Sequence, residues 1–224
     1  MDRTHSTSNR RPHWLATALC LCLLLPSSGC LHQILATGIY LADGGNLVDA
    51  PCEDLEEQRV VVFCRPPLSS EYSHAGASRQ LAKRVSSLLR DNVKDIDMVD
   101  PREVDSWLDE NDSDDYEALG QAVGADRVVR IELDHFDLFK GKTLYQGNAD
   151  VTVKVYDMTD GGREMWDAPM GEMLFPVNSG IPAQDKPVRQ FQREFVQVLA
   201  GSISRNFYRH DPHADFAIDA LANR

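Results

Sequence analysis

One stretch of the chain, residues 143–156, alternates between apolar and polar side chains. The apolar members fall on one side and the polar members on the other: Ala149, Val151, Val153 and Val155, against Asp150, Thr152, Lys154 and Tyr156. A period of two residues is typical of a strand and would scatter these apolar side chains around a helix. The stretch therefore predicts a β-sheet with one buried face and one face in water.

The residues that follow this stretch predict a hairpin. Residues 157–162 form a polar, glycine-rich turn, which supplies the positive φ angles that hairpins use. Residues 163–175 then return as a second strand. Pro169 in that strand has no N–H to donate, so we expect the strand at an edge of the sheet, or with a bulge at this position.

Further elements are expected on both sides of the hairpin. Strands are predicted over 59–63, 96–100 and 127–133, and helices over 76–93, 100–110, 114–124 and 188–211. Asp100 followed by Pro101, and Asp114 followed by Glu117, are typical of helix starts. The order predicts an α+β fold of the α/β sandwich type. It has a mixed sheet of about five strands, helices packed on one or both faces, and a long C-terminal helix.

Residues 1–29 have the pattern of an export signal. Arginines precede an apolar run over 15–25, which at ~1.5 Å per residue is too short to cross a bilayer as a helix. Ser27-Ser-Gly-Cys30 is similar to the lipobox of bacterial lipoproteins, with Ser27 where Leu is favoured. We expect removal of the signal peptide and lipid attachment at Cys30. Plain secretion with a free Cys30 is the alternative.

After cleavage before Cys30, the mature chain is expected to have three parts. We expect residues 30–57 to be a lipid-anchored tether and lead-in, residues 58–210 a single globular α/β domain, and residues 211–224 a polar C-terminal tail. The apolar stretch 31–41 either lies on the bilayer beside the acyl chains or packs on the domain. This organisation predicts a protein of the cell envelope, anchored to a membrane and facing the periplasm.

Two further cysteines of the mature chain, Cys52 and Cys64, form an even pair. In an oxidising compartment they are candidates for a disulfide, which would tie the lead-in to the end of the first strand. Two buried thiols are the alternative, since Cys is often a core residue.

Charge and motifs exclude several classes of function. Asp and Glu total 35 against 23 Lys and Arg, and a net charge of −12 argues against a nucleic-acid partner. The sequence has no nucleophile elbow, phosphate-binding loop or Cys-x-x-Cys pair, so we expect no enzyme activity and no cofactor. The acidic run 109–115 lacks the glycine of an EF-hand loop. One candidate metal site remains, made of His210, Asp211, His213 and Asp215.

Two short motifs resemble a group of bacterial envelope proteins. Gly124-Ala-Asp-Arg-Val-Val129 joins a predicted helix to a predicted strand, and Val153-Lys-Val-Tyr-Asp157 precedes a glycine turn and a strand containing Trp166. Both are similar to motifs of the amino-terminal domain of TolB, the curli secretion channel and the lipoprotein activators of penicillin-binding proteins. The turn here is one residue longer between Thr159 and Gly161. The resemblance spans residues 59–209 and implies a non-catalytic protein that binds other envelope proteins.

Together these observations predict a membrane-anchored envelope lipoprotein that acts as a non-catalytic protein-interaction module. It would bind the membrane through lipid at Cys30, and its envelope partner is unknown. Two surfaces are candidates for docking: the sheet edge at 165–175, which can accept a partner strand, and the acidic helix pair at 100–124. An oligomeric secretion-channel subunit is one alternative, and a metal-binding protein or enzyme is another.

Overall fold

The computed structural model describes residues 47–66, 71–111 and 115–212. The chain divides into two compact units, Met1–Asn46 and Leu47–Arg224, and every described residue belongs to the second. Several predictions fall outside the described residues: the signal peptide, the lipid site at Cys30, and His213 and Asp215 of the candidate metal site.

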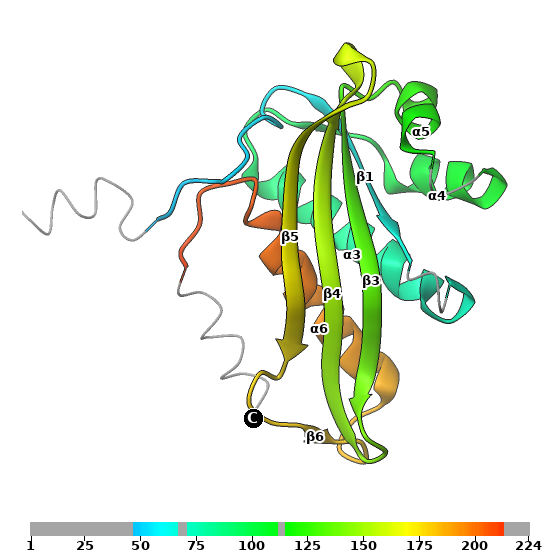
Figure 1. Ribbon diagram of the computed structural model, residues 1–224, viewed down its shortest axis with the longest axis vertical. Helices are drawn as coiled ribbons and strands as arrows, with labels where there is room; N and C mark the ends of the chain where they lie inside the picture. Colours follow the sequence, from blue (N-terminus) through cyan, green and yellow to red (C-terminus); the bar gives the residue numbers. More distant parts are fainter. Residues whose placement is uncertain (1–46, 67–70, 112–114, 213–224) are drawn as a thin grey trace, which may run out of the picture. The chain divides into compact units, whose positions relative to one another are not determined.

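The described strands form one mixed sheet (Figure 1). They are β1 (Arg59–Arg65), β2 (Asp97–Met98), β3 (Arg127–Lys140), β4 (Leu144–Asp157), β5 (Arg163–Phe175) and β6 (Ile181–Pro182). The order across the sheet is β2-β1-β3-β4-β5, and β6 pairs with the start of β4. β1 is parallel to β2 and β3, whereas β4 is antiparallel to β3, β5 and β6. The predicted α+β fold with a mixed sheet is confirmed.

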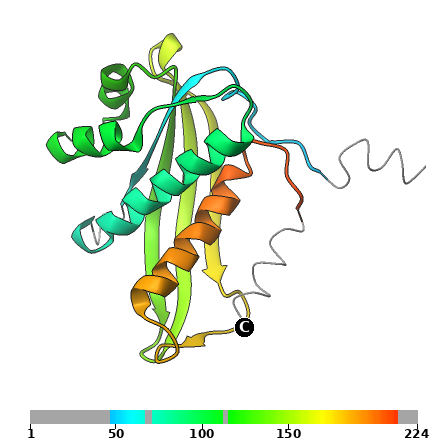
Figure 2. The same ribbon diagram turned by 180° about the vertical axis from the view of Figure 1, so that it is seen from behind.

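Two long helices, α3 (Glu71–Asn92) and α6 (Val188–Ser204), lie side by side on one face of the sheet (Figure 2). The apolar side of β4 faces them, and its four predicted core residues are each 0% exposed. Phe195 of α6 lies so close to Gly147 that a Cβ there would come within 2.5 Å of its ring. The apolar residues buried on this face, the large cluster, include Leu81, Val85, Leu89, Ile131, Val153, Phe191, Phe195, Leu199 and Ile203.

Two short helices, α4 (Pro101–Glu110) and α5 (Tyr116–Val123), pack on the other face beside β1 and β3. The small cluster that they enclose consists of Val61, Phe63, Val99, Val104, Leu119, Ala125, Val128 and Tyr156. Tyr156 lies on the side of β4 predicted to face water. It is only 6% exposed because Tyr116 of α5 stacks on it, with ring centroids 3.8 Å apart. In Figure 1 none of the described helices covers the remainder of this face of β4 and β5.

Side-chain caps fix the beginnings of both short helices. The Arg102 N–H donates to Oδ1 of Asp100 at 2.8 Å, with Pro101 in the first turn as predicted. The cap of α5 is Asp115 rather than the predicted Asp114, and its Oδ1 accepts from the Ala118 N–H at 2.9 Å. The two side-chain caps therefore define the residue at which each helix begins.

β5 is the edge strand of the described sheet and carries an irregularity at Pro169. Pro169 pairs with Thr152 and Gly171 pairs with Val151, so one extra residue, Met170, bulges out of the ladder. Gly171 has a φ of 68°, a backbone conformation that residues with a Cβ rarely adopt. The prediction of an edge strand or a bulge is confirmed on both counts.

Candidate interaction surfaces

The first predicted docking surface, the edge of β5, has three features that disfavour strand addition. Pro169 interrupts the row of N–H donors, and the bulge before Gly171 bends the strand. Exposed charges also line the strand, at Glu164, Asp167 and Glu172. Natural sheets use these devices to protect an open edge from pairing. The structure therefore makes this edge a poor acceptor for a partner strand.

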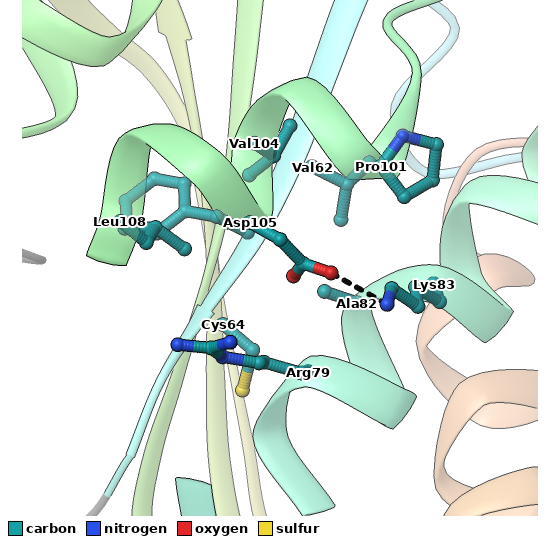
Figure 3. A pocket seen from close by; sticks show the side chains of 10 residues that line it. Val62, Cys64, Arg79, Ala82, Lys83, Pro101, Val104, Asp105 and Leu108 are labelled. Atoms are coloured by element: carbon teal, nitrogen blue, oxygen red, sulfur yellow. Dashed lines mark ion pairs between the residues drawn. The ribbon is translucent and has the colours of Figure 1, made fainter. Parts of the chain in front are cut away.

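The opposite edge of the sheet is closed by helices. β2 pairs with only the first two residues of β1, and α4 lies beside the rest of that strand. Figure 3 shows the seam between α3 and α4, where Lys83 Nζ lies 2.5 Å from Asp105 Oδ2. Arg79 forms a second ion pair across this seam, with Asp109. The cavity here measures about 10 Å³, the space of one water molecule, and leaves no room for a small-molecule ligand.

The second predicted docking surface, the helix pair, holds an open groove of about 430 Å³. The groove is lined by Arg102, Glu103, Ser106 and Trp107 of α4 and by Ala122 and Val123 of α5. Trp107 is half-buried, because it packs against the small cluster and also lines the groove. Glu103 is the exposed acidic side chain of the lining, and the two helices carry further exposed carboxylates at Asp109, Glu110 and Glu117. We call this surface the helix-pair groove.

Trp107 is a residue that the sequence analysis did not single out. A tryptophan among the charged residues of a short helix is a usable signal, because large aromatic side chains are enriched at protein interfaces. The sequence did not indicate how far apart α4 and α5 lie, and that spacing creates the groove.

The uncovered part of the sheet carries a network of ion pairs. Arg130 Nε lies 3.1 Å from Glu132 Oε1, and Lys154 Nζ lies 3.9 Å from Glu132 Oε2 and 3.7 Å from Glu164 Oε2. The Arg130 guanidinium also lies over the ring of Tyr116, with its Cζ 5.9 Å from the ring centroid. These opposite charges link three strands to α5 and have a structural role.

Asp157, at the turn after β4, has several partners at one of its carboxylate oxygens. The Thr159 hydroxyl donates to Asp157 Oδ1 at 2.6 Å, and this hydrogen bond is the main reason that the pKa of Asp157 lies below its usual range. Arg127 Nη1 lies 2.6 Å from the same oxygen. Burial raises the pKa of nearby Tyr156 to about 12, so its phenol stays protonated. Neither group is poised to act as a base near neutral pH.

In the structure Cys52 and Cys64 are free, buried thiols, which corresponds to the second of the two alternatives left open by the sequence. The physical reason is the path of the lead-in, which packs against the end of α6, where the Cys52 N–H donates to the Asn206 carbonyl oxygen at 2.9 Å. Cys64 instead lies near the end of β1, beside α3 and α4. Burial raises the pKa of Cys52 to about 11 and that of Cys64 to about 12, which makes both weak nucleophiles.

The candidate metal site is only partly within the described residues. Nδ1 of His210 lies 3.1 Å from the Tyr208 carbonyl oxygen, and Asp211 is exposed. His213 and Asp215 lie outside the described ranges. Within those ranges, no group of three or more His, Cys, Asp or Glu side chains is placed to hold a metal ion.

No model of a known protein family matches the chain, and no curated protein matches it. Among solved structures, the PelC dodecamer from Paraburkholderia phytofirmans is 13% identical, with a TM-score of 0.44 over 73% of this chain and 96% of that chain. Lipoprotein GNA1162 from Neisseria meningitidis is 15% identical, with a TM-score of 0.38 over 65% and 96%. A minor lipoprotein from Acinetobacter baumannii is 14% identical, with a TM-score of 0.29 over 66% and 89%. Likeness at this level assigns no function to the chain.

None of the helices in the described ranges is both long enough and apolar enough to cross a bilayer.

Proposed function

We propose that the protein is a membrane-anchored, non-catalytic module that binds another protein of the bacterial envelope through the helix-pair groove. The observation that carries this proposal is the position of Trp107, half-buried in the wall of an open groove. Tryptophan is among the residues that dominate binding energy at protein interfaces, because it buries a large and rigid surface. Ala122 and Val123 extend that apolar surface onto α5.

The groove is built on a firm base, which lowers the entropic cost of binding. Val104 of α4 and Leu119 of α5 are 5% and 0% exposed, so each helix is anchored in the small cluster. The caps at Asp100 and Asp115 define where the helices begin. A partner would therefore meet a surface that needs little rearrangement.

The charge of the helix pair indicates the chemistry of the partner. The helix pair exposes four carboxylates, at Glu103, Asp109, Glu110 and Glu117, against one basic side chain, Arg102. Complementary charge steers association and suppresses wrong partners. We expect a partner segment that places an apolar side chain beside Trp107 and flanks it with Lys or Arg.

Anchoring at Cys30 and the lack of catalysis complete the proposal. The export signal and the lipobox-like residues 27–30 support the anchor. The raised thiol pKa values and the paired charges of the sheet support a role without catalysis.

No observation specifically favours the secretion-channel alternative. The large cluster occupies one face of the β3–β4 hairpin, and ion pairs occupy part of the other.

Site-specific photo-crosslinking in intact cells tests the groove. A photoreactive residue at Ser106 or Ala122, which are both exposed, should yield a discrete adduct with a second protein. Trp107→Ala should abolish that adduct while leaving the circular dichroism spectrum unchanged. A matched probe at Gln197, exposed on α6, should give no adduct. Groove probes that give no adduct, or the same adduct as the control, would exclude this docking surface.

Mass spectrometry of the mature N-terminus tests the anchor. The expected species begins at Cys30 and carries acyl chains. An unmodified Cys30 after signal removal would contradict membrane anchoring and leave the groove to be judged by crosslinking.

A further inference from the structure

One end of the domain exposes several apolar side chains together. Phe139 in β3, Val177 in the loop after β5 and Val188 at the start of α6 are 44%, 51% and 37% exposed. Figures 1 and 2 both place the β3–β4 turn, β6 and the beginning of α6 at this end. We call the surface of residues 139–143, 177–180 and 186–189 the tip. Single exposed apolar residues are common, but a group at one end indicates a contact surface.

Tyr145 of β4 holds the segments of the tip together. It pairs with Phe139 across the sheet, and it also pairs with β6. Its ring centroid lies 5.2 Å from that of Phe139 and 5.0 Å from that of Phe191, in the first turn of α6. The adjacent Gln146 side chain donates to the Pro176 carbonyl oxygen at 2.8 Å, which fixes the loop after β5. The exposed apolar side chains therefore project from a preformed frame.

The tip is basic, although the whole chain has a net charge of −12. Its exposed basic side chains are Lys140, Lys142 and Arg189. A fourth, Lys186, is paired with Glu194 at 2.8 Å. Two acidic residues lie beside the tip: Asp185, and Asp137, whose Oδ1 accepts from the Phe139 N–H at 3.0 Å. The tip thus has the charge opposite to that of the acidic helix pair, α4 and α5.

We propose that the tip contacts a bilayer surface rich in anionic phospholipid. Its apolar side chains enter the interfacial region, while its basic side chains lie at the phosphates. Apolar insertion and electrostatic attraction together are what bind peripheral protein surfaces to anionic membranes. The exposed side chains of the helix pair are instead mostly acidic, so the two surfaces select different contacts.

The bilayer is within reach of the tip if the chain is anchored as proposed. The chain from Cys30 to Leu47 spans up to about 60 Å when extended, against about 48 Å for the length of β4. The tether length therefore does not prevent the tip from meeting the membrane that holds the lipid. This step rests on the proposed anchoring at Cys30.

Quenching of a fluorophore by brominated phospholipid measures the contact. The full chain, processed as in the cell, carries Thr143→Cys at the tip or Gln121→Cys on α5 as the matched control, and both positions are exposed. Cys52 and Cys64 react slowly because they are buried, and the unsubstituted protein gives the background. We expect quenching at position 143 in vesicles of phosphatidylcholine with phosphatidylglycerol. We expect none in phosphatidylcholine alone, and none at position 121 in either.

Two sets of substitutions separate charge from apolar insertion. Lys140→Ala with Lys142→Ala should lower the ratio of quenched to unquenched label by roughly thirtyfold, since each basic side chain near an anionic surface contributes about a fivefold factor. Phe139→Ser should lower it by about tenfold. All three side chains are exposed, so the circular dichroism spectrum should stay unchanged.

Co-sedimentation with the same vesicles reports the anchor separately from the tip. Protein that pellets with an unquenched label at position 143 would overturn the tip contact and leave the anchor intact. Equal quenching in anionic and zwitterionic vesicles would also overturn the proposal, because charge would then not select the surface. Protein absent from both pellets would contradict both the anchor and the tip contact.

Discussion

The two faces of the sheet are covered in different ways. α3 and α6 enclose the large cluster on one face, whereas α4 and α5 enclose only the small cluster on the other. Hydrophobic stabilisation scales with the apolar area removed from water, so the first face supplies most of it. The second face leaves a groove and a charged surface accessible. If the helix-pair groove binds a partner as proposed, stability and recognition are assigned to opposite sides of one sheet, and the following experiments test that division.

The largest expected effect is on the covered face. Phe195 is 0% exposed, and its ring centroid lies 5.4 Å from that of Phe136 and 6.5 Å from that of Phe175. Phe195→Ala should lower the free energy of unfolding by ~3–5 kcal/mol, measured by urea denaturation. The matched control is Phe139→Ala, which removes a 44% exposed ring and should cost less. Equal losses would break the assignment of stability to the large cluster.

A smaller and more local effect is expected on the other face. Leu119 is 0% exposed in the small cluster, and Leu119→Ala should cost about 2 kcal/mol, the low end for a buried leucine, because this cluster is smaller than the one on the other face. Hydrogen exchange should accelerate in α5 while the amides of β4 keep their protection. If β4 loses protection to the same extent, the two faces unfold as one unit.

The buried thiols provide a pH test. Their folded pKa values, about 11 for Cys52 and about 12 for Cys64, lie above the ordinary 9.0, because burial disfavours the thiolate. Their contribution to stability is therefore complete below pH 9 and is lost as pH rises through 11 and 12. Between pH 9.0 and these folded pKa values, the free energy of unfolding should fall by at most ~1.4 kcal/mol per pH unit for each thiol. Cys64→Ala should make this slope shallower, and an unchanged slope would show that Cys64 ionises freely in the folded protein.

The smallest effect is expected at the seam between the faces. The side chains of Lys83 and Asp105 are 47% and 23% exposed, so their ion pair should contribute less than ~1 kcal/mol. A double-mutant cycle of Lys83→Ala and Asp105→Ala, by urea denaturation at low and high salt, measures this coupling. A coupling well above that value would show that the seam, and not the small cluster, holds α4 in place.

The sheet was predictable from sequence because its signals are local. Alternation in β4 and the missing donor of Pro169 follow from neighbouring residues alone. The burial of Tyr156 was not predictable, since it depends on Tyr116, which packs onto it from another element. The sequence could not decide between a Cys52–Cys64 disulfide and two buried thiols, because a count of cysteines carries no distances. The candidate groove required the same non-local information: the helix pair could be predicted, but its spacing could not.

The irregular edge of β5 has a consequence for copies of the protein on a membrane. Molecules tethered to a bilayer, as proposed for this chain, meet one another in two dimensions at high local concentration. A straight, regular strand at the sheet margin would then template the next copy and build ribbons. The displaced Met170 and the proline before it remove that template. Many copies can therefore share one membrane patch without polymerising through their sheets.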